Sequence, residues 1–391
     1  MELIKVTDKK TVREFLQAAR EVYRGDPNWV CPPDRTIESI FDPAVNDLFR
    51  DGEAARWILK SAKGDLIGRV AAFYNRGKAS KYRFPVGGMG FFESVDDAEA
   101  AGKLFDVCSD WLEQKGMKAM DGPVNFGENV NFWGLLVEGF TPPAVGMNYH
   151  HPYYKKLFEG YGFKPFFEQE TRIIDLSVPF PERFWKIAEW VIRKPGYRFE
   201  HFRWKHVEKF ASDIAGIHNQ AWVYHQHFTP LTARAVLENF RSLRSFIEED
   251  FIWFVYYNGH PVAFFVMLPD INQILRSFNG KMGLIDGLRF YFMKRSGIVN
   301  RARITIMGVI PRFQGIGIES AIFWHLREPV LRKRPHYREL EISWVGDFNP
   351  KMRSLLEAMN PKPGKRHITY RKMFDESIPF ERAAEIGGGR S

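Results

Sequence analysis

The sequence predicts an α/β protein with a mixed sheet, built from two tandem copies of one fold. Its 391 residues are long for one domain and comfortable for two. The same order of strands and helices occurs twice along the chain, in residues 1–178 and again in residues 196–376. We expect residues 179–195 to connect the two halves and residues 377–391 to form a flexible tail.

In the first half, alternating apolar runs predict strands, and apolar positions three and four residues apart predict helices. The predicted order is strand 2–7, helix 8–22, hairpin 56–74, strand 86–92, helix 96–115, strand 117–121, helix 153–161 and strand 166–176. Asp8 or Thr11 is the expected N-cap of the first helix, because short polar side chains accept from unpaired amides.

The second half repeats this pattern after a connector that is helical over residues 182–192. Its predicted order is strand 197–203, helices 204–222 and 231–246, hairpin 251–268, strand 303–310, strand 338–344, helix 350–359 and strand 367–374. Asn258-Gly259 is the hairpin turn, since both residues tolerate positive φ. A basic and aromatic insert occupies residues 269–298.

Composition excludes several classes of protein. Two cysteines, Cys31 and Cys108, are too few for a disulfide framework or a metal cluster, so we expect no metal. Apolar runs are short and no signal-like N-terminus is present, which predicts a cytoplasmic protein without a membrane partner. Lysine and arginine exceed aspartate and glutamate by 56 − 47 = 9. That excess suits phosphates, nucleic acid or a lipid surface, but it is dispersed, which favours an ordinary solvated basic surface.

One stretch has the pattern of an anion site. The apolar strand 304–310 meets Pro311, the loop Arg312-Phe313-Gln314-Gly315-Ile316-Gly317 follows, and an amphipathic helix begins. Unpaired amides at a helix start and the helix dipole favour negative charge, and glycine allows close backbone approach. The loop lacks one glycine of the dinucleotide fingerprint and the Lys-Ser/Thr of a P-loop. The alternative is a glycine-rich turn without a ligand.

This R-x-x-G-x-G loop between strand and helix resembles the acetyl-CoA pyrophosphate loop of the GNAT superfamily of N-acyltransferases. The order of elements in both halves is similar to that of the family, and residues 151–163 resemble its late helix. The resemblance implies two tandem GNAT-like folds, with acetyl-CoA or another acyl-CoA as co-substrate. It also implies transfer of an acetyl group to a primary amine of a small molecule or peptide.

The family's motif maps its cofactor contacts onto the second half. The resemblance implies that the strand backbone contacts pantetheine, that the loop cradles the pyrophosphate, and that an asparagine after the next strand contacts the pantetheine arm. Those positions are Met307, Gly308 and Val309; Arg312, Gln314, Gly315, Ile316 and Gly317; and Asn349. Asn349 also suits a helix N-cap.

Two departures from the family pattern limit what each half is expected to do. The first half has an acidic run, Glu93 to Glu99, where the loop would lie, so we predict that this half does not bind acetyl-CoA. The family often uses a late-helix tyrosine as general acid, but that position is Leu356 here and Phe158 in the first half. A proton donor must therefore come from elsewhere or be water.

Candidate catalytic residues lie on the strand after the loop. Glu341 and Ser343 share one face of that strand and are predicted to reach the cleft, one of them as general base, while Glu339 is expected to be solvated. A solvated or salt-bridged role is the alternative for each.

Candidate acceptor contacts come from two polar segments. Trp222, His225 and His227 belong to a dense aromatic loop, HNQAWVYHQHFTP, that suits a binding surface or simple packing. Asn125 and Asn129 either bind substrate or cap turns. No cysteine or carboxylate accompanies the histidines at ligand spacing, which argues against a metal site.

Two other functions stay open from the sequence. A tRNA-dependent aminoacyl transferase also pairs two such folds, although an intact R-x-x-G-x-G loop argues against a donor other than CoA. A non-catalytic acyl-CoA-binding protein would explain Leu356 and the degenerate first half. We expect a monomer or homodimer, and no nucleic acid partner.

Overall fold

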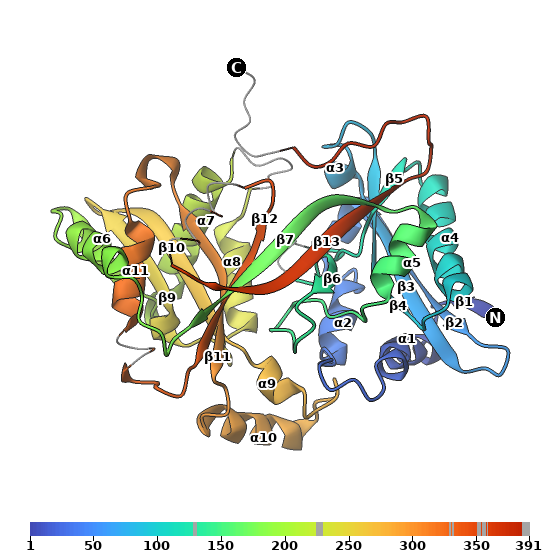
Figure 1. The fold of residues 1–391 in the computed structure, drawn as a ribbon, viewed down its shortest axis with the longest axis horizontal. Coiled ribbons are helices and arrows are strands. Elements are labelled where there is room, and N and C mark those ends of the chain that lie inside the picture. The colour runs from blue at the N-terminus through green and yellow to red at the C-terminus, as the bar shows by residue number, and fades with distance from the viewer. Residues whose placement is uncertain are drawn as a thin grey trace.

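The computed structural model contains one continuous mixed sheet that runs through both halves of the chain (Figure 1). It describes all residues except 128–130, 224–229, 328–329, 331, 350–352, 354–356, 358 and 385–391. The strands lie in the order β1-β2-β3-β4-β5-β13-β7-β12-β11-β10-β9-β8, with β6 paired to β13. The mixed α/β class and the two repeated halves predicted from the sequence are confirmed.

The first half carries strands on one side of the molecule and helices on both faces of them. Its elements are β1 (Glu2–Lys5), α1 (Lys9–Val22), α2 (Asp34–Ile40), β2 (Gly52–Lys60), β3 (Leu66–Asn75), α3 (Arg76–Ala79), β4 (Val86–Ser94), α4 (Ala98–Gln114), β5 (Ala119–Gly122), β6 (Leu135–Glu138), α5 (Tyr154–Tyr161) and β7 (Lys164–Asp175). Asp8 caps α1 together with Thr11 in a capping box, as the sequence predicts.

The second half repeats the arrangement with an added pair of helices. Its elements are α6 (Glu182–Ile192), β8 (Tyr197–His201), α7 (Val207–Ala221), α8 (Ala233–Ser242), β9 (Ile252–Tyr257), β10 (His260–Pro269), α9 (Asn272–Leu275), α10 (Leu284–Arg295), β11 (Arg301–Val309), α11 (Ile318–Arg327), β12 (Glu339–Gly346) and β13 (Lys362–Met373). Asn258 and Gly259 both have positive φ in the predicted β9–β10 turn.

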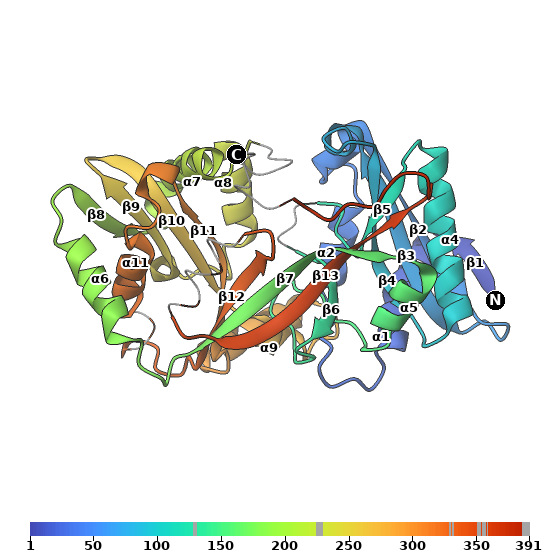
Figure 2. The same cartoon turned by 45° about the horizontal axis from the view of Figure 1, so that its top comes forward.

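The two long strands β7 and β13 cross from one half to the other (Figure 2). β7 pairs antiparallel with β12 of the second half, and β13 pairs with both β7 and β5. Tyr370 of β13 is buried in the core of the first half, whereas Ile174 of β7 is buried in the core of the second. The division at residues 178 and 196 stays a prediction, but the sheet itself does not divide there.

The first half buries two separate apolar layers because successive strand residues face opposite sides of a sheet. Phe15 of α1 packs on Ala71 and Phe73 of β3 on one face. On the other face, Leu104 and Phe105 of α4 pack on the alternate residues of β2 and β3. Each layer excludes water from one side of the sheet and fixes the position of β4 between them.

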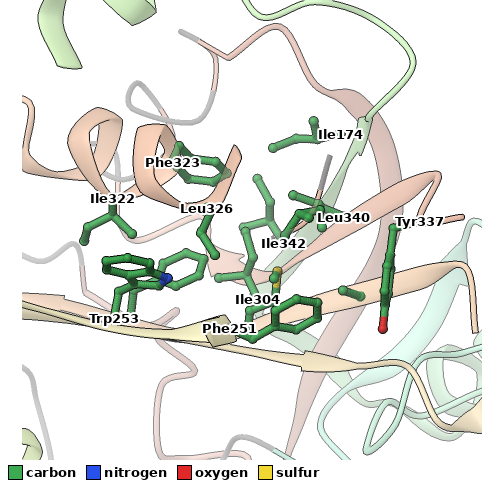
Figure 3. Packing of buried hydrophobic residues seen from close by; sticks show 14 of the residues in the cluster. Ile174, Phe251, Trp253, Ile304, Ile322, Phe323, Leu326, Tyr337, Leu340 and Ile342 are labelled. Atoms are coloured by element: carbon green, nitrogen blue, oxygen red, sulfur yellow. The ribbon is translucent and has the colours of Figure 1, made fainter. Parts of the chain in front are cut away.

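The second half has the same two layers. Phe323 and Leu326 of α11 pack over Ile304 and Ile342, a pair on the strands that form the site described below (Figure 3). Helices α7 and α8 cover the opposite face. Helix α6 has the limits predicted for the helix inside the connector. It buries Phe184, Ala188 and Val191 against α11, so it belongs to the core of the second half.

Candidate functional site

Two parallel strands of the second half pair at one end and separate at the other. β11 and β12 pair from Arg301↔Glu339 to Ile304↔Ile342, and the pairing of the described residues ends there. β11 continues to Val309 and β12 to Gly346. The pairing of β11 with its other neighbour, β10, has a register shift between Val266 and Met267, which marks a β-bulge close to the last β11–β12 pair. The result is a splay whose open side exposes backbone groups of β11.

The direction of the β11 amides follows from the antiparallel ladder with β10. The Ile310 N–H donates to the Val262 carbonyl at 3.0 Å, so Ile310 faces β10. Alternation then turns Gly308 toward β10 and turns Met307 and Val309 toward the splay. The predicted backbone role therefore suits Met307 and Val309, while Gly308 is paired with Phe264.

The predicted anion loop lies at the end of β11. Gly315 and Gly317 have φ values of 74° and 90°, which L side chains rarely adopt. A Cβ on Gly317 would lie 2.2 Å from Ile187 Cγ2 of α6, so this glycine also permits a close approach between the loop and a helix. Helix α11 begins at Ile318, and its first amides are directed at the loop.

The remaining loop side chains leave the loop accessible. Arg312 and Gln314 are exposed, and Ile316 is half-buried against the core. The Gln314 side-chain amide donates to the Val309 carbonyl at 3.0 Å, which ties the loop to the end of β11. Arg312 is thus a positive charge in solvent beside a helix N-terminus, where an anion is stabilised.

Trp222 lies beside the same strand. A Cβ on Gly308 would lie 2.7 Å from Trp222 Cζ3, so the absence of a side chain at residue 308 makes room for the indole ring. His218 stacks on this ring, with centroids 4.8 Å apart. The structure therefore places Trp222, which was predicted to contact the acceptor substrate, beside β11, which was predicted to contact the cofactor.

The first half has a similar splay, but its own chain fills it. β4 and β5 pair only from Val86↔Ala119 to Gly88↔Asp121. Beyond that point the Val124 N–H donates to the Met89 carbonyl at 2.8 Å. A Cβ on Gly90 would lie 1.9 Å from the Val124 carbonyl oxygen. The segment after β5 thus occupies the place that β11 leaves open in the second half.

The acidic run of the first half is divided between two roles. Asp97 caps α4 by accepting from the amides of Glu99 and Ala100, as a helix start favours. Glu93, expected beside that helix, lies instead on β4, where it accepts from Tyr154 at 3.0 Å and faces Arg69 at 3.4 Å. Burial raises the pKa of Glu93.

Glu341 was expected to reach the cleft, and this expectation is not met. Its side chain is fully buried and lies 3.5 Å from Lys365 Nζ and 3.7 Å from Arg301 Nη1. Thr171 donates to the same carboxylate at 3.1 Å. Asp270, also fully buried, pairs with Arg301 at 2.6 Å. The segment at Thr141 and Pro142 of the first half closes the surroundings of Glu341, because Lys365 donates to Thr141 Oγ1 and Arg301 donates to the Pro142 carbonyl.

Ser343 lies one residue beyond the last β11–β12 pair, at the start of the splay. Arg303 Nη2 donates to Ser343 Oγ at 3.2 Å, and the guanidinium lies 5.0 Å from the Trp133 ring. Burial lowers the pKa of Arg303 to about 10. Trp133 in turn lies 6.2 Å from Trp344. The first half therefore supplies an aromatic wall at the base of the second-half splay.

Sequence reasoning missed the buried charges around this wall. The residues not singled out were Arg301, Arg303, Asp270 and Lys365, although Arg301 and Arg303 stand at alternate positions directly before an apolar β-branched run. That alternation was the available signal, because a charge on the inner face of a strand requires a partner. The partners come from distant segments, which no local pattern reveals.

Solved structures with this arrangement identify the fold. A tandem GNAT protein from the clavulanic acid biosynthesis pathway aligns over 97% of this chain and 99% of its own, at a TM-score of 0.56 and 11% identity. A GCN5-related N-acetyltransferase from Sphaerobacter thermophilus aligns over 97% and 98%, at 0.52 and 13%. The chain has the tandem GNAT fold. The likeness is one of fold and does not extend to activity or substrate.

Two curated proteins are similar in sequence to this chain along nearly its whole length. Protein YghO of Escherichia coli (strain K12) is 27% identical over 384 residues, which is 93% of each chain. A bacterial ceramide synthase of Caulobacter vibrioides is 25% identical over 378 residues, which is 95% of this chain and 96% of that protein. No protein-family model matches the chain.

The second half contains groups that fit the pyrophosphate of CoA. Two left-handed glycines, the first amides of α11 and the exposed Arg312 suit a pyrophosphate. Glu319, in the first turn of α11, is the one nearby carboxyl group among the described loop and helix residues. Glu319 is buried, and this burial raises the pKa of its carboxyl group.

The remaining predicted site residues lie outside the loop and the splay or outside the described residues. Asn349 follows β12, and its N–H donates to the Gly346 carbonyl at 3.0 Å. Asn125 lies next to Val124 in the segment that fills the first splay. His225, His227, Asn129 and Leu356 lie outside the described residues. Within the described part of the chain, no group of three or more metal-type ligands occurs, and no helix is long and apolar enough to cross a membrane.

Proposed function

We propose that this tandem GNAT protein is an acyl-CoA-dependent N-acyltransferase whose acceptor is a long-chain primary amine. The splay of β11 and β12 beside the R-x-x-G-x-G loop is the observation that carries the proposal, since it combines backbone amides for a thioester with an anion site. The second half would hold the donor. The first half, with its splay filled by Val124, would shape the acceptor side.

In the proposed reaction the amine nitrogen attacks the thioester carbonyl carbon. The C–N bond forms, the C–S bond breaks, the nitrogen loses a proton and the CoA thiolate gains one. An amide of Met307 or Val309 would donate to the developing oxyanion, which stabilises the transition state more than the substrate. Ser343, at the start of the splay, is the better placed of the two predicted proton-transfer residues, because Glu341 is enclosed.

The long-chain acceptor is supported by a sequence relative and by chemistry near the splay. A ceramide is the amide of a long-chain amino alcohol, and a relative over 95% of this chain is named a bacterial ceramide synthase. Trp222 and Trp344 are half-buried and lie beside β11 and on β12, so they offer aromatic surface near the splay, whereas Trp133 is fully buried against Trp344. Aromatic surface suits an apolar acceptor better than a charged peptide. The competing proposal is an N-acetyltransferase that uses acetyl-CoA as donor and a small amine as acceptor.

The test measures free CoA released from acetyl-CoA or palmitoyl-CoA, with sphinganine, glucosamine or a peptide amine as acceptor. We expect release that requires both palmitoyl-CoA and sphinganine, and a new amide detectable by mass spectrometry. Thermal stabilisation by each acyl-CoA gives an independent measure of donor binding. Arg312→Glu should abolish that stabilisation, whereas the control Arg50→Glu, at a residue with an 81% exposed side chain, should retain it.

Each other outcome rejects a defined part of the proposal. No CoA-dependent stabilisation and no CoA release would reject the donor. Release with acetyl-CoA and glucosamine alone would reject the long-chain acceptor. Stabilisation without release for any amine would indicate the non-catalytic acyl-CoA-binding alternative. Transfer from an aminoacyl-tRNA, without use of any acyl-CoA, would favour the tRNA-dependent alternative.

A further inference from the structure

Helix α10 carries an apolar face that points away from the rest of the protein. It lies at the bottom of the view in Figure 1, below α9 and away from the sheet. Thirteen large apolar side chains of the described residues are exposed, and six of them fall between residues 282 and 298. These six are Met282, Ile285, Leu288, Tyr291, Phe292 and Ile298. Such concentration on one surface indicates a contact with a partner.

Helix geometry separates this face from the one that anchors the helix. Ile285, Leu288 and Phe292 lie at i, i+3 and i+7, so they share one side of α10. They are 81%, 65% and 67% exposed. Phe290, on the opposite side, is buried and packs against Phe246 with centroids 5.6 Å apart. The helix is therefore apolar on both sides, and only one of these sides is covered by the protein.

The charges around the exposed face are positive. Residues 276–300 contain five lysines and arginines and one acid, Asp286. Asp286 accepts from the Gly283 amide at 2.8 Å as a helix cap. Lys294 turns inward to Glu248 at 2.9 Å. Arg289 and Arg295 are exposed, and Arg295 lies 4.5 Å from the Tyr291 ring. The outer surface thus combines large apolar side chains with cations.

We propose that α10 is a docking surface for anionic phospholipid bilayers, with its outer face inserted at the headgroup level. An interfacial helix needs apolar side chains on one face and cations that meet lipid phosphates, and α10 supplies both. A second copy of the chain fits less well, because pairing two such faces would oppose Arg289 and Arg295 with their own equivalents. Sequence analysis predicted no membrane partner because it considered membrane-spanning runs, which an interfacial helix does not need.

This surface is separate from the proposed acyl-transfer site, and its test uses no acyl-CoA or amine. The protein is floated with vesicles of phosphatidylcholine alone, or of phosphatidylcholine mixed with phosphatidylglycerol, at low and high salt. We expect binding to the anionic vesicles that weakens as salt is raised, because exposed charges are screened. Leu288→Asp/Phe292→Asp should reduce the partition coefficient by about a hundred-fold.

Two further variants make the result specific. Arg289→Glu/Arg295→Glu should remove the preference for anionic vesicles and its salt dependence. Val45→Asp/Val178→Asp is the matched control, since these side chains are 63% and 53% exposed elsewhere, and it should bind like the wild type. All substituted side chains are exposed, and unchanged thermal unfolding confirms that each variant folds.

The proposal fails if the wild type does not float with anionic vesicles, or if Leu288→Asp/Phe292→Asp binds as well as the wild type. Analytical sedimentation of the protein without vesicles measures its oligomeric state and so tests the alternative, in which a second copy of the chain covers this face. A dimer that becomes a monomer in Leu288→Asp/Phe292→Asp, with no vesicle binding by the wild type, would assign the face to a second copy and overturn the lipid proposal. None of these results bears on CoA release.

Discussion

Replacement of Gly317 by alanine tests whether the loop conformation depends on backbone angle alone or also on contact with α6. Gly315 and Gly317 both have positive φ, at 74° and 90°. A Cβ added to Gly315 would meet nothing within 4 Å, whereas a Cβ on Gly317 would lie 2.2 Å from Ile187 Cγ2. Gly315→Ala is therefore a matched control that carries the backbone cost without the clash.

The expected energies follow from these two environments. A left-handed conformation costs a residue with a Cβ about 1–2 kcal/mol, which is the whole effect expected for Gly315→Ala. Overpacking adds about 1–3 kcal/mol at Gly317. Gly317→Ala should therefore lower the free energy of unfolding, measured by urea titration, by clearly more than Gly315→Ala.

A double-mutant cycle identifies the source of the difference. Ile187→Ala removes the atom that clashes, so the cost of Gly317→Ala should shrink in that background. Acyl-CoA stabilisation, followed in the same variants, reports whether the loop keeps its anion-binding shape. Equal costs for the two glycine substitutions, or no coupling to Ile187, would refute the reasoning, because α6 would then yield to the added methyl group.

Two further predictions concern the buried charges between the halves. Lys365→Met should lower the free energy of unfolding by about 3–5 kcal/mol, because it leaves the Glu341 carboxylate short of a partner. Lys362→Met, at a residue with a 65% exposed side chain, should cost under about 1 kcal/mol by the same urea titration. Burial lowers the pKa of His367 to about 4 from 6.5, so its contribution to stability is complete above pH 6.5 and is lost as the pH falls toward 4. The loss is about 3 kcal/mol and should vanish in His367→Gln, but not in the exposed control His260→Gln; an unchanged acid profile in His367→Gln would contradict this.

Local chemistry made the elements predictable. Asp8 with Thr11 defines a helix start, Asn258-Gly259 defines a hairpin turn, and residues 182–192 were predicted as a helix with its observed limits. The glycine loop was predictable for the same reason, since its conformation depends on residues that are adjacent in sequence. Such signals are complete within a few residues and need no knowledge of the rest of the fold.

The environment of the site could not be predicted in the same way. Glu341 was placed on the correct strand, but its burial depends on Lys365 and on Thr171 of the first half, 170 residues away in sequence. The alternation of side chains along a strand shows which residues share a face of the sheet. It does not show which of the two faces another segment covers. The filled first splay likewise depends on Val124 reaching Met89, a contact between segments that periodicity does not connect.

The crossing of β7 and β13 has a consequence for how the chain folds during synthesis. The Arg371–Asp121 ion pair joins residues 250 apart in sequence, and Ile368 and Tyr370 complete an apolar core whose other buried members come from the N-terminal half. While the ribosome is still adding the second half, β5 has no strand on its outer edge. Contacts of such long sequence separation form slowly and leave an unpaired strand edge exposed meanwhile. The N-terminal half therefore depends on β13, and it completes its sheet only after that strand of the second half has been synthesised.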